Sequence, residues 1–310
     1  MKRFLKLSLL FALPVLLVIC VCECLVRCHP NSYRYKHEWM MEHRRDVNTL
    51  ILGASQAYAG IKPDLLDDCA FNLANVSQHY EHDWWLLSHY GEEMPRLKTV
   101  ILTLDDCMPF EGPLEDAVES YRATYYRLYM GHDKHSWVSR WGLECINVTQ
   151  FRAKLNRVVA GNTSLDCDSL GWGTTFGGKK KCDETTMRRL ALNTWERHRC
   201  RDRSMISYNM QFVDSVGQWC LAHGVQLVLV TPPLWQGYVR EVMDPWQRGA
   251  VDSLGRATAQ KHQALYLNCM DDTTYTIADF HDADHLSPSG AAKFTARIKP
   301  IKSIRTRTRF

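Results

Sequence analysis

The chain has 310 residues, of which 45% are hydrophobic and 23% are charged. This composition is ordinary for a globular protein, and it excludes collagenous, coiled-coil, low-complexity and disordered chains. The formal net charge is +4, from 38 Lys and Arg against 34 Asp and Glu. Such a balanced charge argues against a nucleic-acid partner, because domains that bind phosphates electrostatically usually carry a clustered basic excess.

The N-terminal segment differs from the rest of the chain. Lys2, Arg3 and Lys6 precede an apolar run over residues 7–26, in which Glu23 is expected at the membrane interface. The run is long enough to span a bilayer as a helix, and the basic residues before it favour a cytoplasmic N-terminus. We therefore expect an uncleaved single-pass anchor, with the domain outside the cytoplasm. The alternative is a signal peptide that is removed, which also places the domain outside the cytoplasm.

Short apolar runs bounded by polar, Gly or Pro residues predict strands that are buried on both faces. Such runs occupy residues 47–52, 99–104 and 225–230, with a weaker one at 264–267. The helical stretches between them include residues 81–90, 208–223 and 249–262. Strands that alternate with helices predict an α/β fold with a mainly parallel sheet covered on both sides.

The same patterns suggest how the chain is organised. Residues 1–28 are expected to form a cytoplasmic stub and membrane anchor, followed by a linker at 29–45. The domain is expected to span 46–298, and a basic tail follows at 299–310. The segment 115–201 has no clear strand and is rich in Tyr, Trp and Gly, so it is predicted to be an insertion or helical cap.

Twelve cysteines are present, and no CxxC spacing in the domain suggests a zinc site. Export to an oxidising compartment permits disulfides. Cys167 and Cys182 bracket a glycine-rich stretch that would gain most from a covalent clip, so we expect this pair first. The alternative is that most of the cysteines are small buried hydrophobic residues.

In a parallel sheet, ligands bind beyond the carboxyl ends of the strands. Ser55 follows the first predicted strand through Gly53, at the start of a helix, where it could serve as a nucleophile or as a helix N-cap. Near the C-terminus, Asp282 stands three residues before His285. At this spacing the carboxylate can orient the imidazole while the ring acts as a base on a distant nucleophile.

A metal cluster is the alternative interpretation of the C-terminal segment. Its ligands would be His281, Asp282, Asp284 and His285. Adjacent ligands on one loop rarely converge on one ion without a distant partner, so we expect neither a metal nor another cofactor.

The segment Gly53-Ala54-Ser55, together with residues 282–287 and Gly290-Ala291, resembles the blocks of the SGNH/GDSL hydrolase superfamily. More narrowly, the chain is similar to the membrane-anchored, exported branch that includes the D-alanyl-transfer protein of teichoic acid systems and the alginate O-acetylation proteins. The resemblance covers roughly residues 46–297, without the middle insertion. It implies a flavodoxin-like three-layer sandwich. It also implies a triad in which Ser55 is the nucleophile and an oxyanion donor, with Asp282 and His285 as its partners.

Two other blocks of this family depart from the usual pattern. Residues 71–78 occupy the place of the block that usually carries an oxyanion glycine, and Ser77 stands at that position. We take Ser77, Asn75 and Asp105 as oxyanion or substrate-binding candidates. The third block normally reads Gly-x-Asn-Asp, whereas Asp105 stands here at the asparagine position. A carboxylate repels an oxyanion unless it is protonated or turned away.

These residues lead to the expectation of a membrane-anchored, extracytoplasmic serine esterase or O-acyltransferase. Location and resemblance imply an acylated cell-envelope polysaccharide as the substrate. The acceptor can be water or a sugar hydroxyl, so hydrolysis and transfer both stay open. The alternative from another class is a catalytically inactive envelope scaffold or binding protein of the same fold.

Overall fold

The computed structural model describes residues 1–132, 142–177 and 183–302. It divides into two compact units. Unit 1 consists of Met1–His37 and Glu115–Leu165, and unit 2 consists of Glu38–Leu114 and Asp166–Phe310. Cys182 and most of the expected basic tail lie outside the described residues, so the Cys167–Cys182 pair and the tail stay predictions.

A parallel sheet forms the centre of unit 2. Its order is β2-β1-β3-β4-β5, and every neighbouring pair is parallel. This is the flavodoxin-like order. The second strand is added on one side of β1, and β3 and the later strands are added on its other side, so the order of strands reverses between β1 and β3. The strands are β1 (Thr49–Leu52), β2 (Ala70–Asn72), β3 (Thr99–Thr103), β4 (Gln226–Thr231) and β5 (Leu265–Asn268). The predicted α/β fold with a mainly parallel sheet is confirmed.

Burial explains why β1, β3 and β4 could be predicted from apolar runs, a set that did not include the three-residue β2. Every residue of β1, β2, β3 and β4 is buried, whereas β5 at the edge is only partly covered. Strands covered on both faces read as continuous apolar runs, and an edge strand reads less clearly. Register aligns the carboxyl ends, because Leu52 pairs with Leu102 and Thr103 pairs with Val230. The loops after β1 and β3 therefore leave the sheet at the same edge.

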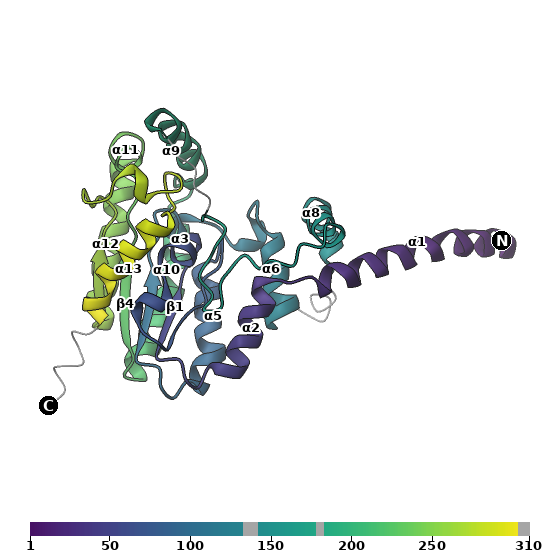
Figure 1. Ribbon diagram of the computed structural model, residues 1–310, viewed down its shortest axis with the longest axis horizontal. Helices are drawn as coiled ribbons and strands as arrows, with labels where there is room; N and C mark the ends of the chain where they lie inside the picture. The colour runs from purple at the N-terminus through teal and green to yellow at the C-terminus, as the bar shows by residue number, and fades with distance from the viewer. Residues whose placement is uncertain (133–141, 178–182, 303–310) are drawn as a thin grey trace. The chain divides into compact units, whose positions relative to one another are not determined.

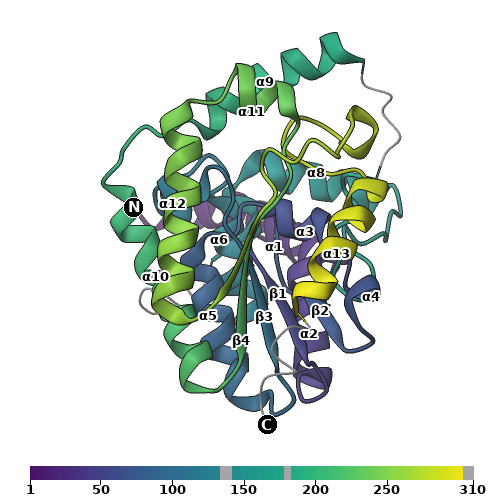
Figure 2. The same ribbon diagram turned by 90° about the vertical axis from the view of Figure 1, so that its left-hand side faces the viewer.

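Helices cover both faces of the sheet (Figures 1 and 2). On one face α5 (Tyr80–Tyr90), α10 (Met205–Ala222) and α12 (Pro245–His262) pack side by side. On the other face α13 (Pro288–Lys302) packs against two short helices, α3 (Ser55–Gly60) and α4 (Pro63–Leu66). The three predicted helices are confirmed, with shifts of a few residues at their starts.

The remaining elements of unit 2 lie outside the sheet layers. Helices α9 and α11 pack against each other beyond the carboxyl end of β4, as Figure 2 shows. The elements are η1 (Gly91–Glu93), η2 (Met108–Phe110), α9 (Glu184–His198), α11 (Gln236–Glu241) and η6 (Ile277–Asp279). Two elements, α2 (Ser32–His43) and η3 (Leu114–Asp116), cross the boundary between the units.

Unit 1 combines a long N-terminal helix with part of the predicted insertion. Its elements are α1 (Lys2–Cys28), α6 (Tyr121–Tyr125), the π-helical η4 (Tyr126–Met130), η5 (Glu144–Ile146) and α8 (Val148–Val159). The Tyr33 ring meets Tyr125 and Tyr126 edge-on, with centroids 5.3 and 5.0 Å apart. These rings are buried, so α6 and the start of η4 contribute to the core of unit 1.

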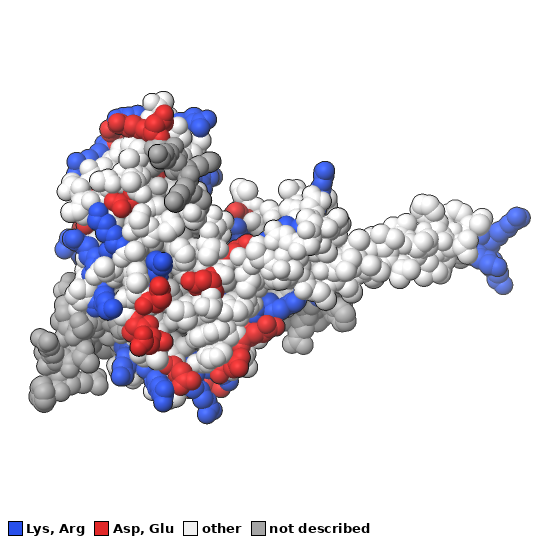
Figure 3. Space-filling view, in the orientation of Figure 1, with Lys and Arg blue, Asp and Glu red and all other residues white. Residues whose placement is uncertain are grey.

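Helix α1 is long and apolar enough to cross a membrane. Figure 3 shows its shaft without charged side chains up to the basic group at its N-terminal end. Charge returns at Glu23, whose carboxylate is buried in unit 1 and accepts the backbone N–H groups of Glu144 and Cys145. The apolar part of α1 is therefore set apart from the packed part, as a membrane anchor or a signal sequence requires.

We predict that replacing both Leu10 and Leu17 with Arg releases the protein from the membrane fraction. Each arginine at the centre of a spanning helix costs about 2.5–3.5 kcal/mol of insertion free energy. Membrane sedimentation after alkaline extraction measures the effect, with Leu10→Ile and Leu17→Ile as the matched control. Intact mass of the mature chain provides a second test, because a chain that begins after the apolar run contradicts an uncleaved anchor.

Candidate active site

Three segments far apart in sequence meet at the carboxyl edge of the sheet. Ser55 is the first residue of α3, three positions after β1 ends at Leu52. His285 and Asp282 lie in the loop between η6 and α13. An antiparallel bridge between Phe280 and Leu286 closes this loop at its base.

The side chains of Ser55, His285 and Asp282 form a continuous chain of hydrogen bonds. Nε2 of His285 lies 2.8 Å from Oγ of Ser55, across 230 positions of sequence. Nδ1 of the same ring lies 2.9 and 3.1 Å from the two carboxylate oxygens of Asp282. The arrangement aligns a hydroxyl, a ring that can take its proton and a carboxylate that fixes the ring tautomer.

Electrostatics favours the charge pattern of a base and its orienting acid. Burial disfavours ionisation of Asp282, but the His285 imidazole and the N–H groups of residues 284 and 285 outweigh it and hold the pKa of Asp282 below its ordinary value. Burial also disfavours a charged His285, yet Asp284 and Asp282 outweigh it and raise the pKa of His285. Asp282 is therefore ionised at neutral pH, and His285 binds a proton more readily than a free imidazole.

A buried carboxyl group ties together the two loops beside Ser55. Asp83, on α5, accepts the backbone N–H of Gly53 at 2.8 Å and the amide of Gln78 at 2.6 Å. Burial raises the pKa of Asp83 to about 8. This group therefore joins the loop after β1 to the loop after β2. Sequence reasoning missed it, because an acidic residue in the first turn of a helix is common.

The loop after β2 contains two of the predicted candidates. Ser77 has a φ of 54°, in the left-handed region that glycine adopts without strain. This backbone fits the expectation that Ser77 occupies a position usually held by glycine. The buried amide of Asn75 donates to Oε1 of Gln78 at 3.3 Å, so it is engaged within the turn. Strand β2 includes Phe71 and Asn72, and the turn therefore begins two residues later than expected.

Asp105 follows β3 and is buried, with a relative exposure of 2%. Its Oδ1 atom has no hydrogen-bond partner among the described residues. Burial raises the pKa of Asp105 to about 7, and the adjacent Asp106 carboxylate adds to the rise. His285 is close enough to act on this pKa in the opposite direction. The protonated form of Asp105, which can donate a hydrogen bond, is therefore substantially populated near neutral pH.

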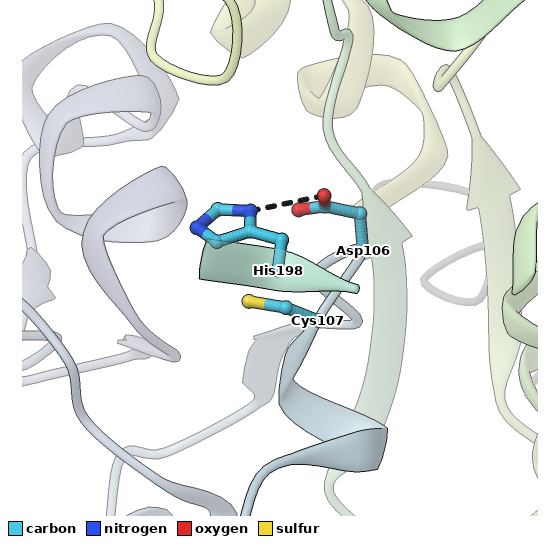
Figure 4. A group of neighbouring side chains, drawn as sticks. All are labelled: Asp106, Cys107 and His198. Carbon is cyan, nitrogen blue, oxygen red and sulfur yellow. Dashed lines mark hydrogen bonds and ion pairs between the residues drawn. The ribbon is translucent and has the colours of Figure 1, made fainter. Parts of the chain in front are cut away.

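A second imidazole lies behind the first. His198, the last residue of α9, approaches Asp106 with Nδ1 at 3.1 Å and Asp284 with Nε2 at 3.7 Å. Asp284 in turn lies 3.4 Å from Nδ1 of His285. Figure 4 shows the contact between His198 and Asp106, with Cys107 beside it. Neither the helix that carries His198 nor its spacing from other residues marks it as part of a site, so sequence reasoning missed it.

Phe176 covers one face of the catalytic candidate His285. The two rings stack with centroids 4.1 Å apart and an interplanar angle of 10°. The segment before Phe176 is held against α3, where the Gly173 N–H donates to the carbonyl of Tyr58 and the Trp172 indole donates to the carbonyl of Ala59. This stretch lies in the predicted insertion, whose glycine-rich sequence gave no signal for such a contact.

Among the described residues, two groups of side chains have atoms close enough to hold a metal ion: Asp106, Cys107 and His198, and Asp282, Asp284 and His285. In the first group, Gln56, Tyr238 and His198 already donate to the Asp106 carboxylate. Burial also raises the pKa of Cys107 to about 12, which keeps the thiol protonated. In the second group, Nε2 of His285 faces Ser55. The Asp106 carboxylate and both nitrogens of His285 are therefore already engaged within the protein, whereas Oδ2 of Asp284 has no hydrogen-bond partner among the described residues.

Comparison with known proteins gave matches in structure alone. The sequence matches no family model and no curated protein. Among solved structures, a GDSL-like lipase from Bacteroides thetaiotaomicron is 9% identical with a TM-score of 0.39, over 89% of this chain and 98% of that one. A carbohydrate acetylesterase family member from Sinorhizobium meliloti is 9% identical with a TM-score of 0.33, over 83% and 98%.

We predict that Gly53→Ala destabilises the protein by about 2–4 kcal/mol. Gly53 has a φ of +129°, and a Cβ atom there would lie 2.1 Å from Oγ1 of Thr103. Backbone strain and overpacking each cost about 1–3 kcal/mol. Thermal unfolding of the full chain in detergent measures the change. Gly112→Ala is the control, because a Cβ atom there meets nothing within 4 Å. Equal unfolding temperatures for the two variants would contradict the prediction.

Proposed function

We propose that the protein is a serine esterase or O-acyltransferase of the SGNH/GDSL kind, anchored in a membrane by α1 with its catalytic unit outside the cytoplasm. The observation that carries the proposal is the continuous hydrogen bonding from Ser55 through His285 to Asp282. A buried serine contact to a histidine is common. A histidine whose other nitrogen meets an ionised carboxylate at the end of a parallel sheet is the arrangement that nucleophilic catalysis requires.

In the proposed reaction, Oγ of Ser55 attacks the carbonyl carbon of an ester, and its proton passes to Nε2 of His285. Asp282 stabilises the imidazolium that forms. The tetrahedral intermediate then collapses, the C–O bond of the ester breaks, and His285 gives the proton to the departing alcohol. The acyl group stays on Ser55 until a second hydroxyl group takes it by the reverse sequence. Water as acceptor completes hydrolysis, and a sugar hydroxyl completes transfer.

The oxyanion of the intermediate needs donors, and the proposal assigns three. The backbone N–H groups of Ser55 and Ser77 are the first two, with Asn75 as a further substrate-binding candidate. The third is the protonated carboxyl group of Asp105. Its burial and its raised pKa support this role, because a neutral acid can donate where an ionised one would repel.

The proposed substrate is an O-acylated polysaccharide of the cell envelope. The argument rests on the resemblance of the sequence blocks and on α1, whose length and composition suit a membrane anchor. Tethering would hold the site within reach of polymers at the membrane surface. A catalytically inactive scaffold is the competing candidate. It is favoured by the carboxyl group of Asp105, which stands where the family pattern has an asparagine amide.

We predict that a fluorophosphonate probe labels the full chain and that Ser55→Ala abolishes the labelling. The probe reacts only with a serine whose proton is removed by a base, so His285→Gln should reduce the labelling rate by roughly a hundredfold or more. Ser253→Ala is the matched control, because this exposed serine lies on α12 and not on the loops that carry Ser55 and His285. A chain that folds but takes up no probe supports the scaffold instead.

We further predict that ester hydrolysis by the native chain has a narrow pH range, which Asp105→Asn widens. Activity rises as His285 loses its proton, at a pH above the ordinary imidazole value because its pKa is raised. Activity then falls as Asp105 loses its proton near pH 7 and begins to repel the oxyanion. The native rate should drop roughly tenfold between about pH 7 and about pH 8.5, whereas the asparagine variant should stay level.

The control for this experiment is Asp252→Asn, which removes a carboxylate paired with Arg256 on the surface of α12. Its pH profile should follow that of the native chain. If the rate of ester hydrolysis depends on pH above pH 7 in the same way in the native chain and in the Asp105→Asn variant, Asp105 is not an oxyanion donor.

A further inference from the structure

The surroundings of His285 pose an electrostatic problem for a catalytic base. Two carboxylates face Nδ1 of the ring, Asp282 at 2.9 Å and Asp284 at 3.4 Å. Each favours the imidazolium over the neutral imidazole. A ring that already holds a proton on both nitrogens cannot accept the proton of Ser55. With both carboxylates uncompensated, His285 would therefore be a strong proton acceptor that is already protonated at neutral pH.

A compensating cation is present on the far side of Asp284. His198 lies with Nε2 3.7 Å from Asp284 and with Nδ1 3.1 Å from Asp106. Although burial disfavours a charged ring, the Asp106 and Asp284 carboxylates outweigh it and raise the pKa of His198 well above its ordinary value. His198 is therefore an imidazolium between two carboxylates.

Asp106 is held ionised as the permanent counterion of His198. Burial opposes this charge, but His198, Tyr238 and Gln56 hold the pKa of Asp106 below its ordinary value. The Tyr238 hydroxyl and the Gln56 amide each donate to the Asp106 carboxylate at 2.8 Å. Gln56 follows Ser55 on α3, so the network that begins at the nucleophile returns to the same helix.

We propose that the imidazolium of His198 acts through Asp284 as a positioning residue, which limits the proton affinity that the two carboxylates give His285 and so enlarges the fraction of rings that are a neutral base for Ser55. This inference deepens the proposed function and rests on it. His198 never touches the reacting atoms. It offsets the charge of Asp284, and its own positive charge disfavours a second cation at His285.

The charged groups around the pair come from several elements. Asp282 and Asp284 face His285 from its own loop, Asp105 acts on it from the end of β3, and Phe176 covers it with an uncharged ring. Around His198 stand Asp106 and Cys107, with Glu111 farther along the same loop.

Two groups other than His198 also contact the Asp284 carboxylate. The Thr194 hydroxyl donates to Oδ1 at 2.8 Å, and the Arg197 guanidinium lies 3.8 Å from the same atom. Removal of the His198 charge therefore takes away the cation that faces Oδ2 of Asp284, the oxygen that lies 3.4 Å from Nδ1 of His285. This fixes the sign of the effect, because the proton affinity of His285 must rise.

The test is the titration of the His285 ring, followed by NMR of histidine-labelled full-length protein in detergent. The resonance is assigned by its loss in His285→Gln. We expect His198→Gln to move the midpoint upward by about half a pH unit or more, and Asp284→Asn to move it downward by a similar amount. Opposite shifts from two neighbours are not expected from a merely structural role.

The control is His223→Gln, which removes a half-exposed histidine beside Glu92 and should leave the midpoint unchanged. The acid limb of ester hydrolysis should move with the NMR midpoint in each variant. Unchanged midpoints, or shifts of the same sign in both variants, overturn the proposal. If His198→Gln does not fold, His198→Asn takes its place, with the same upward shift expected.

This experiment separates the two proposals. The NMR midpoint of His285 can be measured whether or not the chain hydrolyses esters. A native chain that takes up no fluorophosphonate overturns the proposed function, whatever the titration gives. A labelled chain whose His285 midpoint ignores His198 and Asp284 overturns the further inference alone.

Discussion

The cost of burying negative charge governs the carboxyl edge of this sheet. Five carboxyl groups gather there, and four of them are buried: Asp83, Asp105, Asp106 and Asp284, with Asp282 partly exposed. Each needs a proton, an N–H donor or a cation, since an unpaired buried carboxylate is prohibitively costly. The chain uses all three. Burial favours protons on Asp83 and Asp105, and imidazoles and donors keep Asp106 and Asp282 ionised.

This distribution makes the neighbouring loops depend on one another. Asp83 joins the loops after β1 and β2, and Asp106 joins the loop after β3 to α9 and α11. Asp284 joins α9 to the loop that carries His285. Buried carboxyl groups that would be destabilising without partners thus connect the segments of the site through hydrogen bonds and ion pairs. A change at one of them alters the charge that its neighbours must carry.

The sequence was most informative where local pattern and burial coincide. The runs that became β1, β3 and β4 are mostly apolar because both faces of these strands are covered. Ser55, Asp282 and His285 could be predicted because their spacing from a strand end, and from each other, has a chemical meaning. His198 and Asp83 could not be predicted, since their partners lie about 86 and 30 positions away on other elements. The division into two units could not be predicted either, because it depends on tertiary contacts between residues 115–165 and the N-terminal segment, which are far apart in sequence.

The stacking of Phe176 on His285 restricts rotation of the imidazole about its Cβ–Cγ bond. An imidazole can turn over about its Cβ–Cγ bond, which exchanges each ring nitrogen with a ring carbon and would place Cε1 instead of Nε2 toward the serine. Here the aromatic cover leaves little space for the ring to sweep through, and its segment is bonded to α3, the helix that carries Ser55. The segment that carries Phe176 and the serine that faces His285 are therefore both attached to α3. The stacked aromatic ring therefore favours the one orientation of His285 in which Nε2 faces the Ser55 hydroxyl.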